Sequence, residues 1–201
     1  MILEGIVTTL NEDGSTNVSP MGPRVDEALS QFVLRPYRSS TTYRNLKRTG
    51  RGVFHVTDDV ELIAHAALGT PDPLPELTSV PGVEGKILAG ACRWYALQVA
   101  ALDDRNEPTE ILCEVVAEGR LRDFLGFNRG KHAVLEAAIL ATRTEFLPAG
   151  EILSQFERLA VLVGKTGGPA ERRAFAFLND HVQAHCRSDA LPTPDDRIAK
   201  P

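Results

Sequence analysis

Long apolar runs, cysteine pairs and a surplus of positive charge are all missing from this 201-residue chain. None of its apolar runs approaches the roughly eighteen residues of a membrane-spanning helix, so we expect no membrane partner. The first ten residues carry Glu4 and no basic stretch, which predicts a strand and not a signal peptide. The three cysteines, Cys92, Cys113 and Cys186, are widely spaced and form no CxxC pair. They predict no disulfide framework, no four-thiolate zinc site, and a reducing cytoplasm as the location.

The overall charge balance excludes one class of partner. The chain has 22 Lys and Arg against 27 Asp and Glu, a formal net charge of −5. Because a protein that coats duplex nucleic acid needs a surplus of cations to neutralise phosphates, we expect no nucleic-acid partner. The shortage of positive charge is not uniform along the chain, since residues 35–51 hold six basic residues and no acidic one. That segment is compatible with a single bound phosphate group.

Turn residues, prolines and apolar periodicity divide the chain into a strand-rich part and a helical part. We predict strands over residues 1–10, 17–25, 31–36, 52–58, 86–102 and 110–121, short helices over 40–49 and 58–68, and longer helices over 132–143, 150–163 and 169–186. Pro20 and Pro23 place the 17–25 strand at an edge or a bulge, and four prolines within 71–85 predict a loop. Strands followed by helices predict an α+β fold, a small barrel or sheet with a helical extension.

The segment RPYRSSTTYRNL, residues 35–46, has the composition of a phosphate site. Four consecutive hydroxyl residues, Ser39–Thr42, stand at the predicted N-terminus of a helix, where backbone N–H groups lack partners and the dipole is positive. Together with the guanidinium of Arg35 or Arg38, these donors suit a phosphate monoester. Plain helix capping is the alternative interpretation, but one cap needs one hydroxyl residue and not four.

A second polar element is NVSPMG, residues 17–22. Pro20 and Gly22 interrupt a strand ladder, which leaves backbone N–H and C=O groups free to meet a planar polar ligand. A proline and a glycine near a turn are common, so this motif counts only in combination with residues 35–46.

Together, NVSPMG and RPYRSSTTYRNLKRTGRGVFHVTDD resemble the FMN-binding split-barrel superfamily, which includes flavin reductases and relatives of pyridoxamine phosphate oxidase. Within it the chain is most similar to the DUF447 family, whose function is unknown. The resemblance is specific over about residues 1–70 and includes Thr42, Asn45 and the pair Thr49-Gly50. Many flavin reductases carry a lysine-aspartate pair where this chain has Ser39-Ser40. That departure leaves the positive charge at the phosphate to an arginine, and Arg35 and Arg38 both remain open.

The resemblance implies an FMN site and assigns residues to it. The isoalloxazine ring would be lined, largely through backbone groups, by Asn17, Ser19, Pro20 and Met21. The phosphate would be held by Arg35, Ser39, Ser40, Thr41 and Thr42, with Asn45 bracing the turn. Thr57 and Asp58, at the end of the following strand, would lie near the flavin edge. No catalytic side chain and no metal ligand is implied.

The resemblance also implies an organisation and a function. We expect a split-barrel FMN-binding domain over 1–125, a helical extension over 126–187 and a flexible tail over 188–201. The implied activity passes electrons from a reduced nicotinamide through FMN to a small acceptor, in a homodimer with the flavin at its interface. Three alternatives stay open: a flavin-binding or electron-transfer module without turnover, a split barrel that binds a pterin, a deazaflavin or pyridoxal phosphate, and a purely structural dimer.

Two other motifs predict no site. Gly164-Lys165-Thr166 looks like the end of a P-loop, but that pattern requires a glycine where this chain has Leu159. His181 and His185 lie four residues apart on a predicted helix beside Cys186, and no third metal ligand accompanies them.

Overall fold

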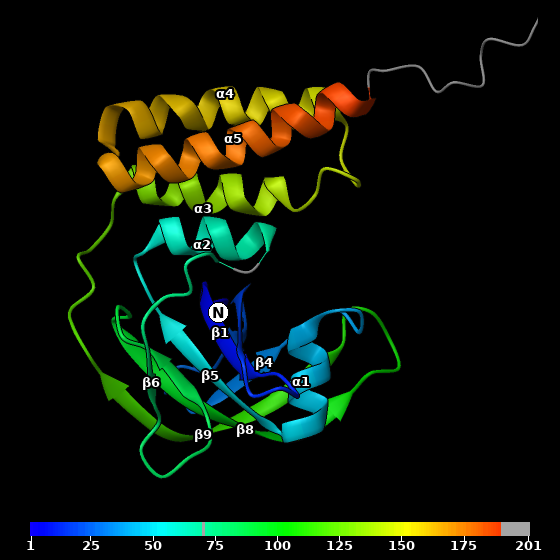
Figure 1. Ribbon diagram of the computed structural model, residues 1–201, viewed down its shortest axis with the longest axis vertical. Coiled ribbons are helices and arrows are strands. Elements are labelled where there is room, and N and C mark those ends of the chain that lie inside the picture. Colours follow the sequence, from blue (N-terminus) through cyan, green and yellow to red (C-terminus); the bar gives the residue numbers. More distant parts are fainter. Residues whose placement is uncertain (70, 190–201) are drawn as a thin grey trace, which may run out of the picture. The chain divides into compact units, whose positions relative to one another are not determined.

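The computed structural model describes residues 1–69 and 71–189 and divides into two compact units (Figure 1). The first unit is Met1–Gly126, and the second begins at Phe127. The tail predicted over 188–201 lies outside the described residues from residue 190 on, and the last helix reaches Asp189.

The first unit is built on a seven-stranded antiparallel sheet. Its strand order is β2-β1-β5-β8-β9-β4-β3. The strands are β1 (Gly5–Leu10), β2 (Thr16–Met21), β3 (Arg24–Val25), β4 (Gln31–Leu34), β5 (Arg51–Val56), β8 (Arg93–Asp103) and β9 (Glu110–Arg120). As Pro20 and Pro23 predict, β2 lies at one end of this order. The sheet and the helices of the chain together confirm the predicted α+β class.

The sheet curls toward a barrel, because the segment before β1 contacts β3 at the far end of the strand order. Ile2, just before β1, bridges Arg24 of β3 in an antiparallel pair. The backbone N–H of Leu3 donates to the carbonyl of Pro23, 3.1 Å away. These contacts join the segment before β1, which is the neighbour of the edge strand β2, to β3 at the opposite end of the strand order.

An apolar core fills the curled sheet. Phe32 of β4 lies 5.3 Å from Phe54 of β5 and 5.4 Å from Tyr95 of β8, measured between ring centroids. All three side chains are buried. Burying three aromatic rings contributes several kcal/mol of hydrophobic stabilisation, at about 25 cal/mol per Å² of apolar area. The core thereby holds the strand ends from which the polar segments project.

A small hairpin, β6 (Leu77–Ser79) with β7 (Lys86–Leu88), covers the outer face of the sheet. The loop predicted over 71–85 is therefore wrong in part, because β6 carries no apolar periodicity and forms by pairing with β7. The single strand predicted over 86–102 is also wrong. A turn at Ala89–Cys92 separates β7 from β8, and the continuous apolar composition there hides the break.

His55 of β5 fixes this hairpin to the sheet. Its Nδ1 lies 3.2 Å from the carbonyl oxygen of Ile6, and its Nε2 accepts a hydrogen bond from the N–H of Leu88 at 3.1 Å. The neutral ring therefore donates from Nδ1 and accepts at Nε2. Burial lowers the pKa of His55 to about 4, because the buried site disfavours the charged form.

Two helices interrupt the strands of the first unit. The helix predicted over 40–49 is α1 (Thr41–Thr49), which begins after the N-cap Ser40 and ends at Gly50, whose φ of 66° is the left-handed conformation that glycine favours. The helix predicted from residue 58 is α2 (Val60–Leu68), with Asp59 as its N-cap. Both helices thus start at a side chain that accepts a backbone N–H.

The second unit consists of three helices that pack on one another (Figure 1). They are α3 (Arg129–Ala141), α4 (Ala149–Thr166) and α5 (Pro169–Asp189). The Nζ of Lys131 lies 2.8 Å from Oε1 of Glu171, which also accepts the N–H of Gly168 at Oε2. Across residues 1–69 and 71–189, no helix combines the length and the apolar character needed to cross a membrane.

Candidate functional site

The N-terminus of α1 uses its four hydroxyl residues in different ways. Ser40 is the cap, and its hydroxyl accepts the N–H of Tyr43 at 3.1 Å. The Thr41 and Thr42 hydroxyl oxygens accept from Arg44 and Asn17 at 3.0 and 3.1 Å. Ser39 is exposed. Capping therefore accounts for one of the four hydroxyl residues and for the N–H of Tyr43, and the N–H groups of Thr41 and Thr42 point toward the open end of the helix.

A network of amides and hydroxyls joins α1 to the β1–β2 hairpin. The amide nitrogen of Asn17 on β2 donates to Thr42 and, at 3.2 Å, to Thr9 of β1. The amide nitrogen of Asn45 donates to Thr9 at 3.0 Å and to the side-chain oxygen of Asn11 at 2.8 Å. Asn45 and Thr42 are almost fully buried. Three of the expected site residues, Asn17, Thr42 and Asn45, are thus brought together, with Thr9 as a shared acceptor that sequence reasoning missed.

The strand β2 continues from this network as a polar edge. Asn17, Ser19 and Met21 alternate with residues of the opposite face, and Asn17 pairs with Thr9 while Met21 pairs with Gly5. The four residue steps from Asn17 to Met21 span about 13 Å, at roughly 3.3 Å per residue. These side chains and Pro20 are half-buried. The strand therefore offers a continuous partly exposed surface that starts beside α1.

The two candidate arginines differ sharply in their surroundings. The Nε of Arg38 donates to Glu107 at 2.8 Å, and its backbone N–H donates to the same carboxylate at 3.1 Å. This carboxylate raises the pKa of Arg38, and the guanidinium lowers the pKa of Glu107. Arg35 is half-buried, and its Nε is the one buried side-chain nitrogen or oxygen, among the described residues, without a hydrogen-bond partner.

An unpaired buried guanidinium nitrogen points to an acceptor that the protein itself does not supply. Leaving such a donor unsatisfied costs free energy, and an anionic oxygen is the acceptor that guanidinium groups bind most strongly. Arg35 therefore fits a phosphate ligand better than Arg38 does.

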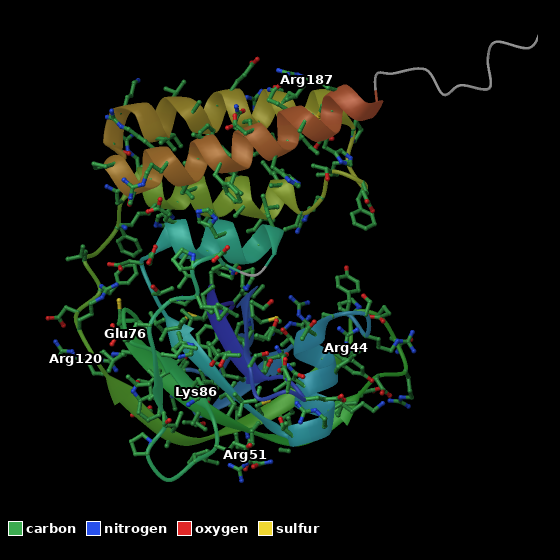
Figure 2. The ribbon with its side chains drawn as sticks, viewed as in Figure 1. Arg44, Arg51, Glu76, Lys86, Arg120 and Arg187 are labelled. Atoms are coloured by element: carbon green, nitrogen blue, oxygen red, sulfur yellow. The ribbon has the colours of Figure 1, made fainter. Side chains whose placement is uncertain are left out.

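Arg44 adds a second cation at the same helix end, which the sequence pattern did not assign to the site. Its Nη1 donates to the carbonyl of Ser39 and its Nη2 to the hydroxyl of Thr41, both at 3.0 Å. The guanidinium thus folds back over the first turn of α1, on the side of the unit away from Arg120 (Figure 2). The i,i+3 spacing of Thr41 and Arg44 on one helix face was the available signal.

The β8–β9 loop supports the segment that leads into α1. The backbone N–H and the hydroxyl of Thr109 both donate to the carbonyl of Pro36, at 3.1 and 2.6 Å. The carboxylate of Asp104 accepts from the Tyr43 hydroxyl at 2.7 Å and from the Lys47 ammonium at 2.8 Å. These two bonds lower the pKa of Asp104. The pKa of Lys47 is raised by its hydrogen bond to Asp104 and by a second one, 3.0 Å long, that it donates to the Tyr43 hydroxyl.

Thr57 and Asp58 lie away from the helix end that carries Ser39–Thr42. They follow β5. On that strand His55 pairs with Ile6 of β1, and Ile6 pairs in turn with Pro20 of β2. They are therefore near the Met21 end of β2. The Asp58 carboxylate is buried and accepts from Arg122 at 2.5 Å and from the N–H of Leu125 at 3.2 Å. In this structure Asp58 anchors the chain after β9.

An open hollow of about 550 Å³ borders α1 on its solvent side. It is lined by Thr41, Arg44, Asn45 and Arg48 of the helix, among others, and by Asn11 and Glu12 of the β1–β2 turn. The hollow begins at the hydroxyl and guanidinium groups described above. Cationic side chains dominate the charge of its lining.

Comparison with family models identifies both units. A model described as the N-terminal domain of a protein of unknown function, DUF447, matches residues 3–122. A second model of the same family, also described as a protein of unknown function, matches residues 128–180. These matches confirm the family resemblance predicted from the two motifs.

Solved structures show the same fold. An FMN-bound DUF447 protein from Methanosarcina mazei is 23% identical, with a TM-score of 0.74 over 90% of this chain and 94% of that chain. The styrene monooxygenase flavin reductase from Pseudomonas putida S12 is 16% identical, with a TM-score of 0.51 over 60% and 82%. A flavoredoxin from Methanosarcina acetivorans is 12% identical, with a TM-score of 0.51 over 59% and 68%. The predicted split-barrel fold is thereby confirmed.

Proposed function

The chain belongs to the DUF447 family, and from this premise we propose that it is a flavoprotein that binds FMN. One observation carries the proposal: the buried Nε of Arg35 has no hydrogen-bond partner. Arg35 lies four residues before Ser39, the first of the hydroxyl residues at the N-terminus of α1. The FMN-bound family member from Methanosarcina mazei, which has the same fold, supports the choice of FMN.

The phosphate of FMN would be held at the N-terminus of α1. Arg35 supplies a donor that has no protein acceptor, and Arg44 supplies a second guanidinium beside Thr41. The Ser39, Ser40, Thr41 and Thr42 hydroxyls and the backbone N–H groups of Thr41 and Thr42 complete the donor set. Asn45 holds this turn to β1 through Thr9 and Asn11, so the donors are positioned before the ligand binds.

The ring of FMN would lie along β2, over Asn17, Ser19, Pro20 and Met21. This strand surface starts where Asn17 bonds to α1 and is about 13 Å long. Its side chains are half-buried in the single chain, so a ring placed on them keeps one face open. A second copy of the chain would cover that face, and we therefore propose a homodimer with the flavin at the interface. Thr57 and Asp58 would lie beyond the Met21 end of the ring.

The proposed activity is electron transfer from a reduced nicotinamide to a small acceptor. When bound, FMN supplies the hydride- and electron-accepting chemistry, and the protein binds and orients it. The proposed site contains amides, hydroxyls and guanidinium groups, and these residues contribute binding and orientation. All three cysteines are free, and two are buried, which agrees with our proposal of a reducing cytoplasmic location.

The visible absorption spectrum of the purified protein tests the proposal. We expect a flavin spectrum, either as purified or after reconstitution with FMN and removal of free ligand, and mass spectrometry of the released molecule should give FMN. A protein that stays colourless and does not change FMN fluorescence would refute flavin binding. Oxidation of NADH or NADPH by the reconstituted protein then separates an oxidoreductase from a module that binds flavin without turnover. Release of a pterin, a deazaflavin or pyridoxal phosphate would replace FMN with that ligand.

A further inference from the structure

A single phosphate leaves part of the basic segment without a role. Lys47 pairs with Asp104 and Arg38 pairs with Glu107. Arg44 and Arg48 instead bond only to neutral oxygens: Arg44 to Ser39 and Thr41, and Arg48 to the Leu10 carbonyl and, at 3.4 Å, to Asn45. Among the ion pairs of the described residues, neither of these two arginines is neutralised by a carboxylate.

These two arginines line the same hollow. Arg44 and Arg48 are both exposed and stand four residues apart on α1, which separates their Cα atoms by about 6 Å along the helix axis. The hollow of about 550 Å³ lies within the range of roughly 300–1,000 Å³ found for small-molecule sites, which is more than one phosphate group requires. Glu12 is the only carboxylate in its lining. The hollow therefore has room and charge for a further anionic group.

We propose that the α1 hollow binds the ADP moiety of a dinucleotide. Arg48 contacts its phosphates, and Arg44 lies between these phosphates and the phosphate site at Thr41. The proposal rests on the proposed function, because it places this moiety next to the FMN phosphate. Two ligands carry the required chemistry: FAD, whose adenylyl half would extend from the flavin phosphate, and a nicotinamide dinucleotide bound beside FMN.

Isothermal titration of ADP into the FMN-saturated full-length protein tests the site directly. Excess FMN occupies the first phosphate site, so the heat reports on the second. We expect ADP to bind, and Arg48→Glu to weaken ADP binding at least about tenfold, as expected for the loss of a charge-assisted contact. FMN affinity, from flavin fluorescence, should change less than about threefold. Arg158→Glu is the matched control, since Arg158 is an exposed arginine within helix α4, and it should leave both affinities unchanged.

Arg48→Gln guards against a folding defect, because Arg48 also contacts the Leu10 carbonyl. This variant keeps a polar side chain, removes the charge, and should weaken ADP binding in the same direction. Titrations with FAD and with NADH or NADPH identify the source: the ligand that loses affinity in Arg48→Glu is the one that occupies the hollow.

The outcomes separate the two proposals. FMN binding without ADP binding at millimolar concentration, or ADP binding unchanged in both Arg48 variants, would overturn the ADP site and leave the proposed function standing. ADP binding that depends on Arg48 in a protein that does not bind FMN would support the hollow as a nucleotide site and refute the proposed function.

Discussion

The carboxylate of Glu107 holds Arg38 by two hydrogen bonds, one to the side-chain Nε at 2.8 Å and one to the backbone N–H at 3.1 Å. This pair ties the segment before α1 to the β8–β9 loop. It gives Arg38 a partner within the protein, whereas Arg35 has a buried Nε without one. We therefore propose different roles for the two arginines: Arg35 would bind the phosphate, and Arg38 would position the segment.

Arg38→Gln and Glu107→Gln should have the same effect, because each breaks the same contact. We expect both to weaken FMN binding by a similar factor of about two to five, through looser positioning of the α1 N-terminus, since exposed ion pairs contribute little individually. The measurement is the FMN dissociation constant of each variant and of the double variant. If Arg38→Gln weakens binding strongly while Glu107→Gln does not, Arg38 contacts the phosphate directly and this assignment is wrong.

Asn45→Ala should destabilise the first unit. The substitution removes three side-chain hydrogen bonds, two donated to Thr9 and Asn11 and one accepted from Arg48, so the free energy of unfolding should fall by about 1–3 kcal/mol. Urea denaturation without FMN measures it. Thr41→Val is the control on the same helix, because Thr41 is only half-buried, and it should cost less than about 0.5 kcal/mol. Equal losses in the two variants would contradict the bracing role of Asn45.

The stability of the first unit should depend on pH through His55. Its folded-state pKa of about 4 lies below the ordinary value of 6.5, so in this window the unfolded state binds more protons than the folded state. Stability is therefore full above pH 6.5 and falls as the pH drops toward 4, by on the order of 3 kcal/mol in total. Denaturation midpoints between pH 7 and pH 4.5 measure the slope, and His55→Gln should flatten it. A slope that His55→Gln leaves unchanged would show that another group causes it.

Lys131→Met should destabilise the helical unit. Glu171 is 7% exposed, and its pKa is lowered mainly by the hydrogen bond from Lys131. Without that partner its charge is buried and only partly compensated, at a cost of about 2–4 kcal/mol. The double variant Lys131→Met/Glu171→Gln removes the uncompensated charge and should recover much of the loss. Hydrogen exchange of the α3 and α5 amides gives the readout, and a double variant no more stable than the single one would argue against this cause.

Local signals in the sequence are sufficient to predict α1 and its surroundings. Ser40 and Gly50 mark the two ends of the helix, and the excess of hydroxyl residues over one cap is what led us to propose a phosphate site there. The sequence alone does not decide between Arg35 and Arg38, because Glu107, the partner of Arg38, lies 69 residues away in the chain. Strand β6 was missed for the same kind of reason, since its stability comes from pairing with β7. The i,i+3 spacing places Arg44 and Thr41 on one helix face, but the contact between them also depends on a rotamer that composition does not specify.

We propose that Arg35 and the N-terminus of α1 together hold the phosphate of FMN. Riboflavin, which lacks this phosphate, separates phosphate recognition from ring recognition in the same titration. We predict that the parent protein binds FMN about 100-fold or more tightly than riboflavin, and that Arg35→Gln reduces this ratio to below about tenfold while riboflavin affinity stays the same. Equal affinities for FMN and riboflavin in the parent protein, or a ratio that Arg35→Gln leaves unchanged, would contradict the claim.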